Sequence, residues 1–173
     1  MRNIFLLSLV LFLGISCQSN KKKNTDPEAI TTVYYFIRHA EKDRSDISNK
    51  DPELTDIGIQ RAKNWANHFE TIELDQIFST DYKRTQQTAM FTATDQNIQV
   101  ESYDPNNMYN EDFKLLTAGQ TVLIVGHSNT TPVFVNTIIG KQEYPQIEDN
   151  NNGNLYIITI KGDKISASLE NYN

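Results

Sequence analysis

The stretch Tyr34-Tyr35-Phe36-Ile37-Arg38-His39-Ala40-Glu41 is the most informative part of the sequence, because a run of aromatic and β-branched residues ends abruptly at an adjacent arginine and histidine. A nearly continuous apolar strand of this kind is typical of the centre of a parallel sheet, where helices cover both faces. We therefore expect a strand over residues 32–37 that delivers Arg38 and His39 to a site at its carboxyl end.

Two later stretches repeat this arrangement. Ile77-Phe78-Ser79 leads to Arg84, and Val122-Leu123-Ile124-Val125-Gly126 leads to His127. In open α/β sheets, ligands bind outside the carboxyl ends of the strands, so residues that follow different strands meet in one crevice. The sequence therefore predicts one site that contains Arg38, His39, Arg84 and His127.

Strand and helix patterns alternate along the rest of the chain. Thr55 is the expected N-cap of a helix that reaches Phe69, residues 79–81 are expected to cap a second helix, and Thr131-Pro132 is expected to open a third. A short helix is expected over residues 111–116. The further strands are expected at residues 74–78, 98–103, 121–125, 155–160 and 165–169. This order predicts a three-layer α/β/α sandwich with a mostly parallel sheet and an antiparallel edge strand or hairpin.

The first 31 residues have a different composition from the rest. Residues 1–16 have a basic start, a short apolar run and small residues near a cleavage point, which is typical of a signal peptide. Cys17 resembles the lipid-modified cysteine of bacterial lipoproteins, although Gly14 and Ser16 also suit an ordinary signal peptidase. Residues 17–31 are predicted to form a polar tether, and residues 32–173 one domain. The protein is thus expected to be exported to the bacterial cell envelope, with a lipid on Cys17 holding it to the membrane.

The composition limits the partners. The chain carries a formal net charge of −6, and four of its basic residues, Arg2 and Lys21 to Lys23, lie in the signal and tether segments. The domain is therefore strongly acidic, which excludes the basic surface that nucleic-acid binding requires. Any phosphate must be held in a local pocket, so a small phosphorylated substrate is expected.

The four predicted site residues suit phosphoryl transfer. Arginine forks match phosphate oxygens, so Arg38 and Arg84 can position the group and neutralise its charge. A neutral imidazole at His39 can attack phosphorus if a backbone carbonyl holds its other ring nitrogen protonated. His127 can donate to the phosphoryl oxygens, and a carboxylic acid is needed for an alcohol leaving group. Because no two histidines have metal-ligand spacing on one element, no metal and no cofactor are expected.

The motifs also resemble those of a known family. Four blocks of the sequence are similar, in this order, to motifs of the histidine phosphatase superfamily, phosphoglycerate mutase-like branch. They are Arg38-His39-Ala40-Glu41; Leu54-Thr55 with Gly58, Gln60 and Ala62; Ser79 to Arg84-Thr85 with Gln87-Thr88-Ala89; and Gly126-His127-Ser128. Ala40 stands where the mutases have glycine. The resemblance implies that His39 is the phosphorylated nucleophile and that Arg38, Arg84 and His127 complete the phosphate pocket.

The remaining site residues are not fixed by a motif. Asp104 is the first choice for the proton donor and Glu111 the second, while Ser128 and Asn129 are expected to add hydrogen bonds to the phosphate.

The predicted function is that of a metal-independent phosphatase, which hydrolyses phosphomonoesters or phosphohistidine through a phosphohistidine intermediate. The alternatives are a mutase-type phosphotransferase and a non-catalytic phosphate-binding module of the envelope.

Overall fold

The structure is a computed structural model that describes residues 29–173. The predicted signal peptide, the lipidation of Cys17 and nearly all of the predicted tether lie outside the described residues, and the proposed division of the chain into segments stays a prediction. Within the described residues, no helix is long and apolar enough to span a membrane.

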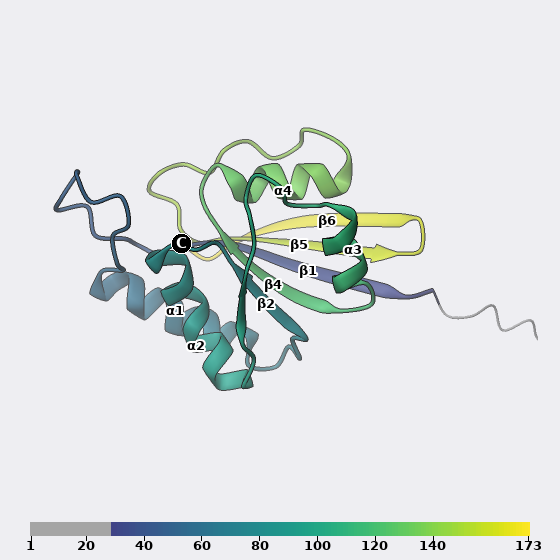
Figure 1. Ribbon diagram of the computed structural model, residues 1–173, viewed down its shortest axis with the longest axis horizontal. Coiled ribbons are helices and arrows are strands. Elements are labelled where there is room, and N and C mark those ends of the chain that lie inside the picture. Colours follow the sequence, from purple (N-terminus) through teal and green to yellow (C-terminus); the bar gives the residue numbers. More distant parts are fainter. Residues whose placement is uncertain (1–28) are drawn as a thin grey trace, which may run out of the picture.

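One mixed sheet forms the centre of the domain (Figure 1). Its strands are β1 (Thr31–Arg38), β2 (Gln76–Ser79), β3 (Val100–Ser102), β4 (Thr121–Gly126), β5 (Asn154–Lys161) and β6 (Lys164–Asn171). They lie in the order β3-β2-β4-β1-β5-β6, in which the first four are mutually parallel. β5 pairs antiparallel with β1, and β6 pairs antiparallel with β5. The predicted mostly parallel sheet with an antiparallel hairpin at its edge is confirmed.

Helices cover both faces of this sheet, as Figure 1 shows for α1 and α2 on one side and α4 on the other. The helices are α1 (Asp56–Phe69), α2 (Lys83–Gln96), α3 (Glu111–Thr117) and α4 (Thr130–Ile139). On one face, Trp65 and Phe69 of α1 and Ala89 of α2 pack against alternate residues of the central strands. On the other, Phe113 of α3 and Phe134 of α4 do the same. The three-layer α/β/α prediction is therefore confirmed.

Both faces of the central strands are buried, which explains their sequence. In β1, Phe36 and Ile37 are adjacent in the chain and each is fully buried, one in each of the two cores. A strand covered on both sides needs apolar residues at every position rather than at alternate ones. The unbroken apolar run of β1 follows from this, and it ends where the sheet meets the site.

One of the three expected helix caps is present. Thr55 accepts a hydrogen bond from the backbone N–H of Gly58 at 3.1 Å, so it caps α1 as predicted. The prediction that residues 79–81 cap α2 is wrong, because α2 begins later, at Lys83, with Tyr82 in the N-cap position. The Thr80 hydroxyl is engaged inside the site instead, with His127 and Thr85.

The start of α4 also differs from the prediction. The helix begins at Thr130 with Asn129 in the N-cap position, so Thr131 lies inside the first turn and is not its cap. The backbone N–H of Thr131 donates to the carbonyl of His127 at 3.1 Å, which draws the helix start toward the end of β4. Pro132 remains in the first turn, where a proline is tolerated because no intrahelical bond needs its nitrogen.

Candidate active site

The carboxyl ends of β1, β2 and β4 meet at one edge of the sheet. Arg38 at the end of β1 is in register with Gly126 of β4, and Ser79 at the end of β2 is in register with Val125. A hollow of about 330 Å³ opens at this edge. It is lined by Arg38, His39, Lys42, Tyr82, Arg84, Pro105, His127, Ser128, Asn129, Thr130 and Asp149. The structure therefore brings together six of the residues that the sequence analysis singled out, including Ser128 and Asn129.

His39 is held in the tautomer that a nucleophile needs. Its Nδ1 lies 2.7 Å from the carbonyl oxygen of Ala40, and because a carbonyl can only accept, Nδ1 must carry the proton. The expectation that a backbone carbonyl holds one ring nitrogen protonated is confirmed. Nε2 has no hydrogen-bond partner among residues 29–173, so its lone pair is free.

Burial also keeps His39 uncharged. The side chain is 4% exposed, and this burial, together with the charges of Arg38 and Arg84, lowers its pKa to about 3. At neutral pH the imidazole is therefore neutral and nucleophilic rather than protonated.

His127 faces His39 across the hollow, with ring centroids 5.5 Å apart. Its Nε2 donates to the Thr80 hydroxyl at 2.9 Å, and that hydroxyl in turn donates to Thr85 at 3.0 Å. Nδ1 is thus the acceptor, 3.4 Å from Nη2 of Arg84. Burial and the charge of Arg84 lower the pKa of His127 to about 4. An anion bound beside Arg84 would favour the protonated imidazole, which can then donate to it.

Arg38 is anchored at one end of its guanidinium group and unpartnered at another. It is 2% exposed, and its Nη1 donates to the backbone carbonyls of Glu148 (2.9 Å), Asp149 (3.2 Å) and Asn151 (2.9 Å). Nη2 donates to the Asp149 carboxylate at 3.2 Å. Nε is buried and has no hydrogen-bond partner among the described residues. The loop after α4 therefore fixes the guanidinium while one of its N–H groups stays available.

Arg84 also has guanidinium N–H groups without hydrogen-bond partners in the described part of the chain. Its Nε and Nη1 are buried without hydrogen-bond partners in residues 29–173, and its carboxylate neighbour Asp51 lies 3.7 Å from Nη1. The guanidinium lies over the ring of Tyr82, 4.3 Å from its centroid. Buried guanidinium N–H groups are costly when unsatisfied. The pocket therefore has the character of a site for an anion with several acceptor oxygens.

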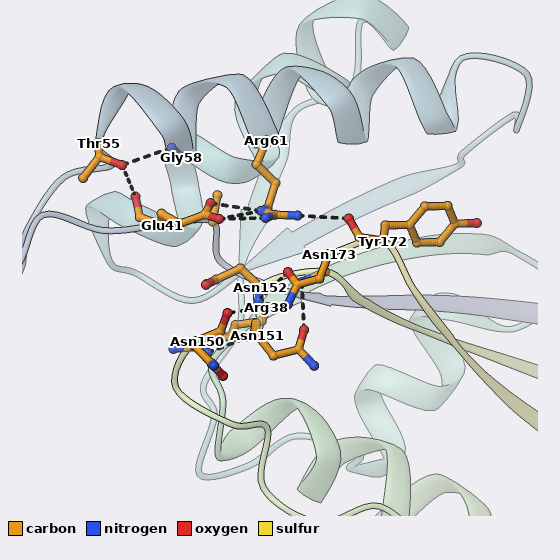
Figure 2. A network of polar contacts seen from close by, with 12 residues as sticks. Arg38, Glu41, Thr55, Gly58, Arg61, Asn150, Asn151, Asn152, Tyr172 and Asn173 are labelled. Carbon is orange, nitrogen blue, oxygen red and sulfur yellow. Dashed lines mark hydrogen bonds and ion pairs between the residues drawn. The ribbon is translucent and has the colours of Figure 1, made fainter.

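A polar network that includes Asn152 and Asn173 (Figure 2) supports the backbone of His39. Asn152 is 5% exposed, and its Nδ2 donates to the carbonyl oxygen of His39 at 2.8 Å. The backbone N–H of Asn152 donates to the side chain of Asn173 at 3.3 Å. Asn173, in the segment that follows β6, thus holds the loop of Asn152, and this loop in turn supports His39.

Glu41 ties the same loop to α1. Its carboxylate forms a close ion pair with Arg61, at 2.8 Å, and its carbonyl accepts from both the backbone N–H and the hydroxyl of Thr55 (Figure 2). Arg61 also donates to the carbonyl of Tyr172 at 3.3 Å. Gly58 lies so close that a Cβ there would overlap the Glu41 carbonyl. This contact explains the glycine in the motif.

The α2 motif residues brace the loop from the other side. The hydroxyl of Thr88 accepts from the backbone N–H of Ala40 at 2.9 Å, and the side-chain oxygen of Gln87 accepts from that of Leu54 at 2.8 Å. Both residues stand in the predicted motif, but the sequence alone gives them no role. Only the tertiary contact reveals their role, because their partners lie more than 30 residues away in the chain.

The two expected proton donors do not line the hollow. Asp104 is exposed, and its carboxylate accepts from the backbone and side chain of Asn106, as in a common turn. Its neighbour Pro105 reaches the hollow instead. Glu111 is an exposed residue in the first turn of α3 that pairs with Lys114 at 2.7 Å. Neither carboxylate is placed to protonate a leaving group in this pocket.

The carboxylate that does line the hollow is Asp149. Within residues 29–173 it is the only acidic residue of the lining. It pairs with Arg44 at 2.8 Å and Arg38 at 3.2 Å, and the hydrogen bond from Arg44 is the largest cause that lowers its pKa. Asp149 is therefore ionised at neutral pH. Asp149 was not predicted as a site residue, because it belongs to an asparagine-rich segment that has the composition of an ordinary turn.

The described residues contain no group of three histidine, cysteine or carboxylate side chains that could hold a metal ion. The positive charge of the pocket comes instead from Arg38, Arg84 and Lys42.

Comparisons with known proteins agree with the motifs. The family model of the histidine phosphatase superfamily (branch 1) matches residues 34–105. The sequence has no match among the curated proteins. The family match over these residues and the shared fold agree with the resemblance of the chain to the histidine phosphatase superfamily.

Several solved structures share the fold of the chain. The protein histidine phosphatase SixA complexed with tungstate is 15% identical, with a TM-score of 0.64 over 80% of this chain and 96% of that one. The α-ribazole phosphatase of Shigella flexneri is 16% identical, with a TM-score of 0.64 over 81% and 96%. A phosphoserine phosphatase variant of Entamoeba histolytica, in complex with phosphoserine, is 16% identical, with a TM-score of 0.63 over 80% and 96%. At such low identities the likeness concerns the fold.

Proposed function

We propose that the protein is a metal-independent phosphatase that forms a phosphohistidine intermediate on His39. The observation that carries this proposal is the pairing of a neutral, correctly tautomerised imidazole with buried, unsatisfied guanidinium N–H groups. Such a pocket binds a phosphoryl group and presents a nucleophile to it. The match to the superfamily model over residues 34–105 and the phosphatase names of the structural neighbours support the same reaction class.

The reaction has two steps. In the first, the Nε2 lone pair of His39 forms an N–P bond while the bond from phosphorus to the leaving group breaks, and the leaving group takes that electron pair. In the second, a water oxygen bonds to phosphorus, the N–P bond breaks, and its electron pair returns to Nε2. Inorganic phosphate leaves, and the protons of the water stay on it or pass to solvent. Arg38 and Arg84 offset the charge on the phosphoryl oxygens throughout. The Ala40 carbonyl stabilises the positive charge that develops on the imidazole.

The lining of the pocket favours leaving groups that need little protonation. Its carboxylate, Asp149, is ionised in ion pairs with two arginines and so has no proton to give at neutral pH. Phosphohistidine releases an imidazole, whose ordinary pKa near 6.5 allows it to take a proton from solvent before it departs. An alcohol leaving group depends much more on a general acid. We therefore place phosphohistidine ahead of simple phosphomonoesters as a substrate.

The test uses two radiolabelled substrates, a phosphohistidine peptide and an alkyl phosphomonoester. The soluble domain is mixed with each and quenched in alkaline detergent, because the N–P bond is labile in acid. We expect label on the protein and faster turnover of the phosphohistidine peptide. His39→Ala should abolish both label and turnover, whereas His68→Ala, a change outside the pocket, should leave both intact. Tight phosphate binding without hydrolysis of either substrate would instead indicate a binding module.

The location of the protein is proposed from the sequence pattern alone. Export to the envelope and a lipid on Cys17 would place the catalytic domain at a membrane surface at the end of a polar tether. Labelling with palmitate should depend on Cys17, and a Cys17→Ser variant that carries the same lipid label would contradict the anchor.

A further inference from the structure

Lys42 lies three residues after His39 and lines the same hollow, although the motif comparison gives it no role. Its backbone is fixed by a bridge to Leu54, and the neighbouring backbone N–H of Asp43 donates to the carbonyl of Glu53 at 2.8 Å. The side chain is partly buried. Lys42 is therefore held at the rim of the pocket rather than placed on a freely moving loop.

The other cations around the pocket have acidic neighbours. Arg38 and Arg44 share Asp149, Lys83 pairs with Glu53 at 3.1 Å, and Arg84 lies 3.7 Å from Asp51. Each of those side chains has a carboxylate to offset its charge.

Lys42 differs from them. No carboxylate of residues 29–173 lies within ion-pairing distance of its ammonium group, and that ammonium group donates no hydrogen bond to the described residues. Burial lowers its pKa, and so do the neighbouring charges of Arg84, Arg44 and Arg38, while Asp149 opposes them. A partly desolvated ammonium among like charges is unfavourable unless an anion completes the cluster.

We propose that Lys42 is a third cationic ligand of the phosphoryl group, beside Arg38 and Arg84. This inference rests on the proposed function, since it concerns the same pocket. With Asp149 ionised, these three cations leave the lining with two net positive charges, which matches a phosphoryl group carrying close to two negative charges at neutral pH.

The residue type suits a role that the arginines cannot fill. Arg38 is anchored through Nη1 to three carbonyls, so its guanidinium cannot follow a moving group. A lysine carries a compact charge on a flexible stem with three rotatable donors. Lys42 can therefore keep contact with the phosphoryl oxygens as phosphorus shifts from the leaving group toward Nε2 of His39.

The test measures the affinity of the soluble domain for inorganic phosphate by titration calorimetry, which needs no turnover. Lys42→Met is expected to raise the Kd about tenfold, equivalent to about 1.4 kcal/mol. Lys42→Arg, which keeps the charge, should stay within about threefold of the wild type. Lys50→Met is the matched control, because Lys50 is an exposed lysine of the same loop that does not line the hollow.

The outcomes separate this inference from the proposed function. A Kd for Lys42→Met that rises less than about threefold, or equally with Lys50→Met, overturns the role of Lys42. Lys42-dependent phosphate binding in a domain that hydrolyses neither substrate supports the role of Lys42 and refutes the phosphatase. Thermal melts of each variant without phosphate show whether the fold is intact, and phosphate-induced stabilisation gives a second measure of affinity.

Discussion

Lowering the pH from 7.5 to 5.0 is expected to destabilise the domain through the two histidines of the pocket. His39 and His127 are buried in the neutral form, with pKa values lowered to about 3 and about 4. In the unfolded chain each returns to an ordinary value of about 6.5. Between these values the unfolded chain binds more protons than the folded protein, so stability falls as the pH drops below about 6.5.

The magnitude follows from the same values. At pH 5.0 both folded-state pKa values still lie below the pH, so the loss is set almost entirely by protonation in the unfolded chain. Each histidine then costs about 2 kcal/mol relative to pH 7.5, and the pair costs about 4 kcal/mol. A change of about half a pKa unit in either folded-state value alters this loss of stability little.

The assay is urea unfolding of the soluble domain at the two pH values, in a buffer without phosphate, because a bound anion would stabilise the folded state. The comparison is with a His39→Gln, His127→Gln double variant, which retains His68, the third histidine of the chain. The variant should lose about 4 kcal/mol less than the wild type on acidification, whatever its stability at pH 7.5. Equal losses in the two proteins would show that the pH effect comes from groups other than His39 and His127.

Three further predictions concern the site and its supports. Incubation with EDTA should leave hydrolysis unchanged, and a loss of turnover that added metal restores would contradict a metal-independent mechanism. Asn152→Ala removes the hydrogen bond to the His39 carbonyl and should lower kcat about tenfold with a smaller change in KM. Asn150→Ala, at an exposed position of the same loop, should keep kcat. Equal kcat values for the two variants would show that the Asn152 side chain does not position His39. Gly58→Ala forces a Cβ against the Glu41 carbonyl and should destabilise the domain by about 1–3 kcal/mol in urea unfolding, and an unchanged midpoint would show that the helix can move away freely.

The fold was largely readable from local patterns. The run from Tyr34 to Ile37 is apolar at every position because two cores bury it, and the order of strands and helices restricts the topology to an α/β sheet. Helix starts were less predictable. The sequence of residues 79–81 has the composition of a cap, but the Thr80 hydroxyl bonds to His127 instead, and this competition exists only in the folded protein.

The candidate site, like the fold, could be predicted from the sequence only in part. Because β1 and β4 are parallel neighbours and β2 pairs with β4, residues that follow these strands had to meet, and the sequence could predict Arg38, His39 and His127 together. It could not predict the acidic partner. Asp104 also follows a strand, but its carboxylate accepts a hydrogen bond within its own loop. Asp149, which lines the hollow, lies in the segment after α4.

The layers of the sheet and the candidate site residues at the strand ends could be predicted from the sequence alone, because apolar periodicity and strand-end positions are local properties. Three features are visible only in the folded protein: the tautomer of His39, the lowered pKa values of both pocket histidines and the unpaired ammonium group of Lys42. These depend on burial and on charges brought from distant parts of the chain, and desolvation arises only when those parts close around the site.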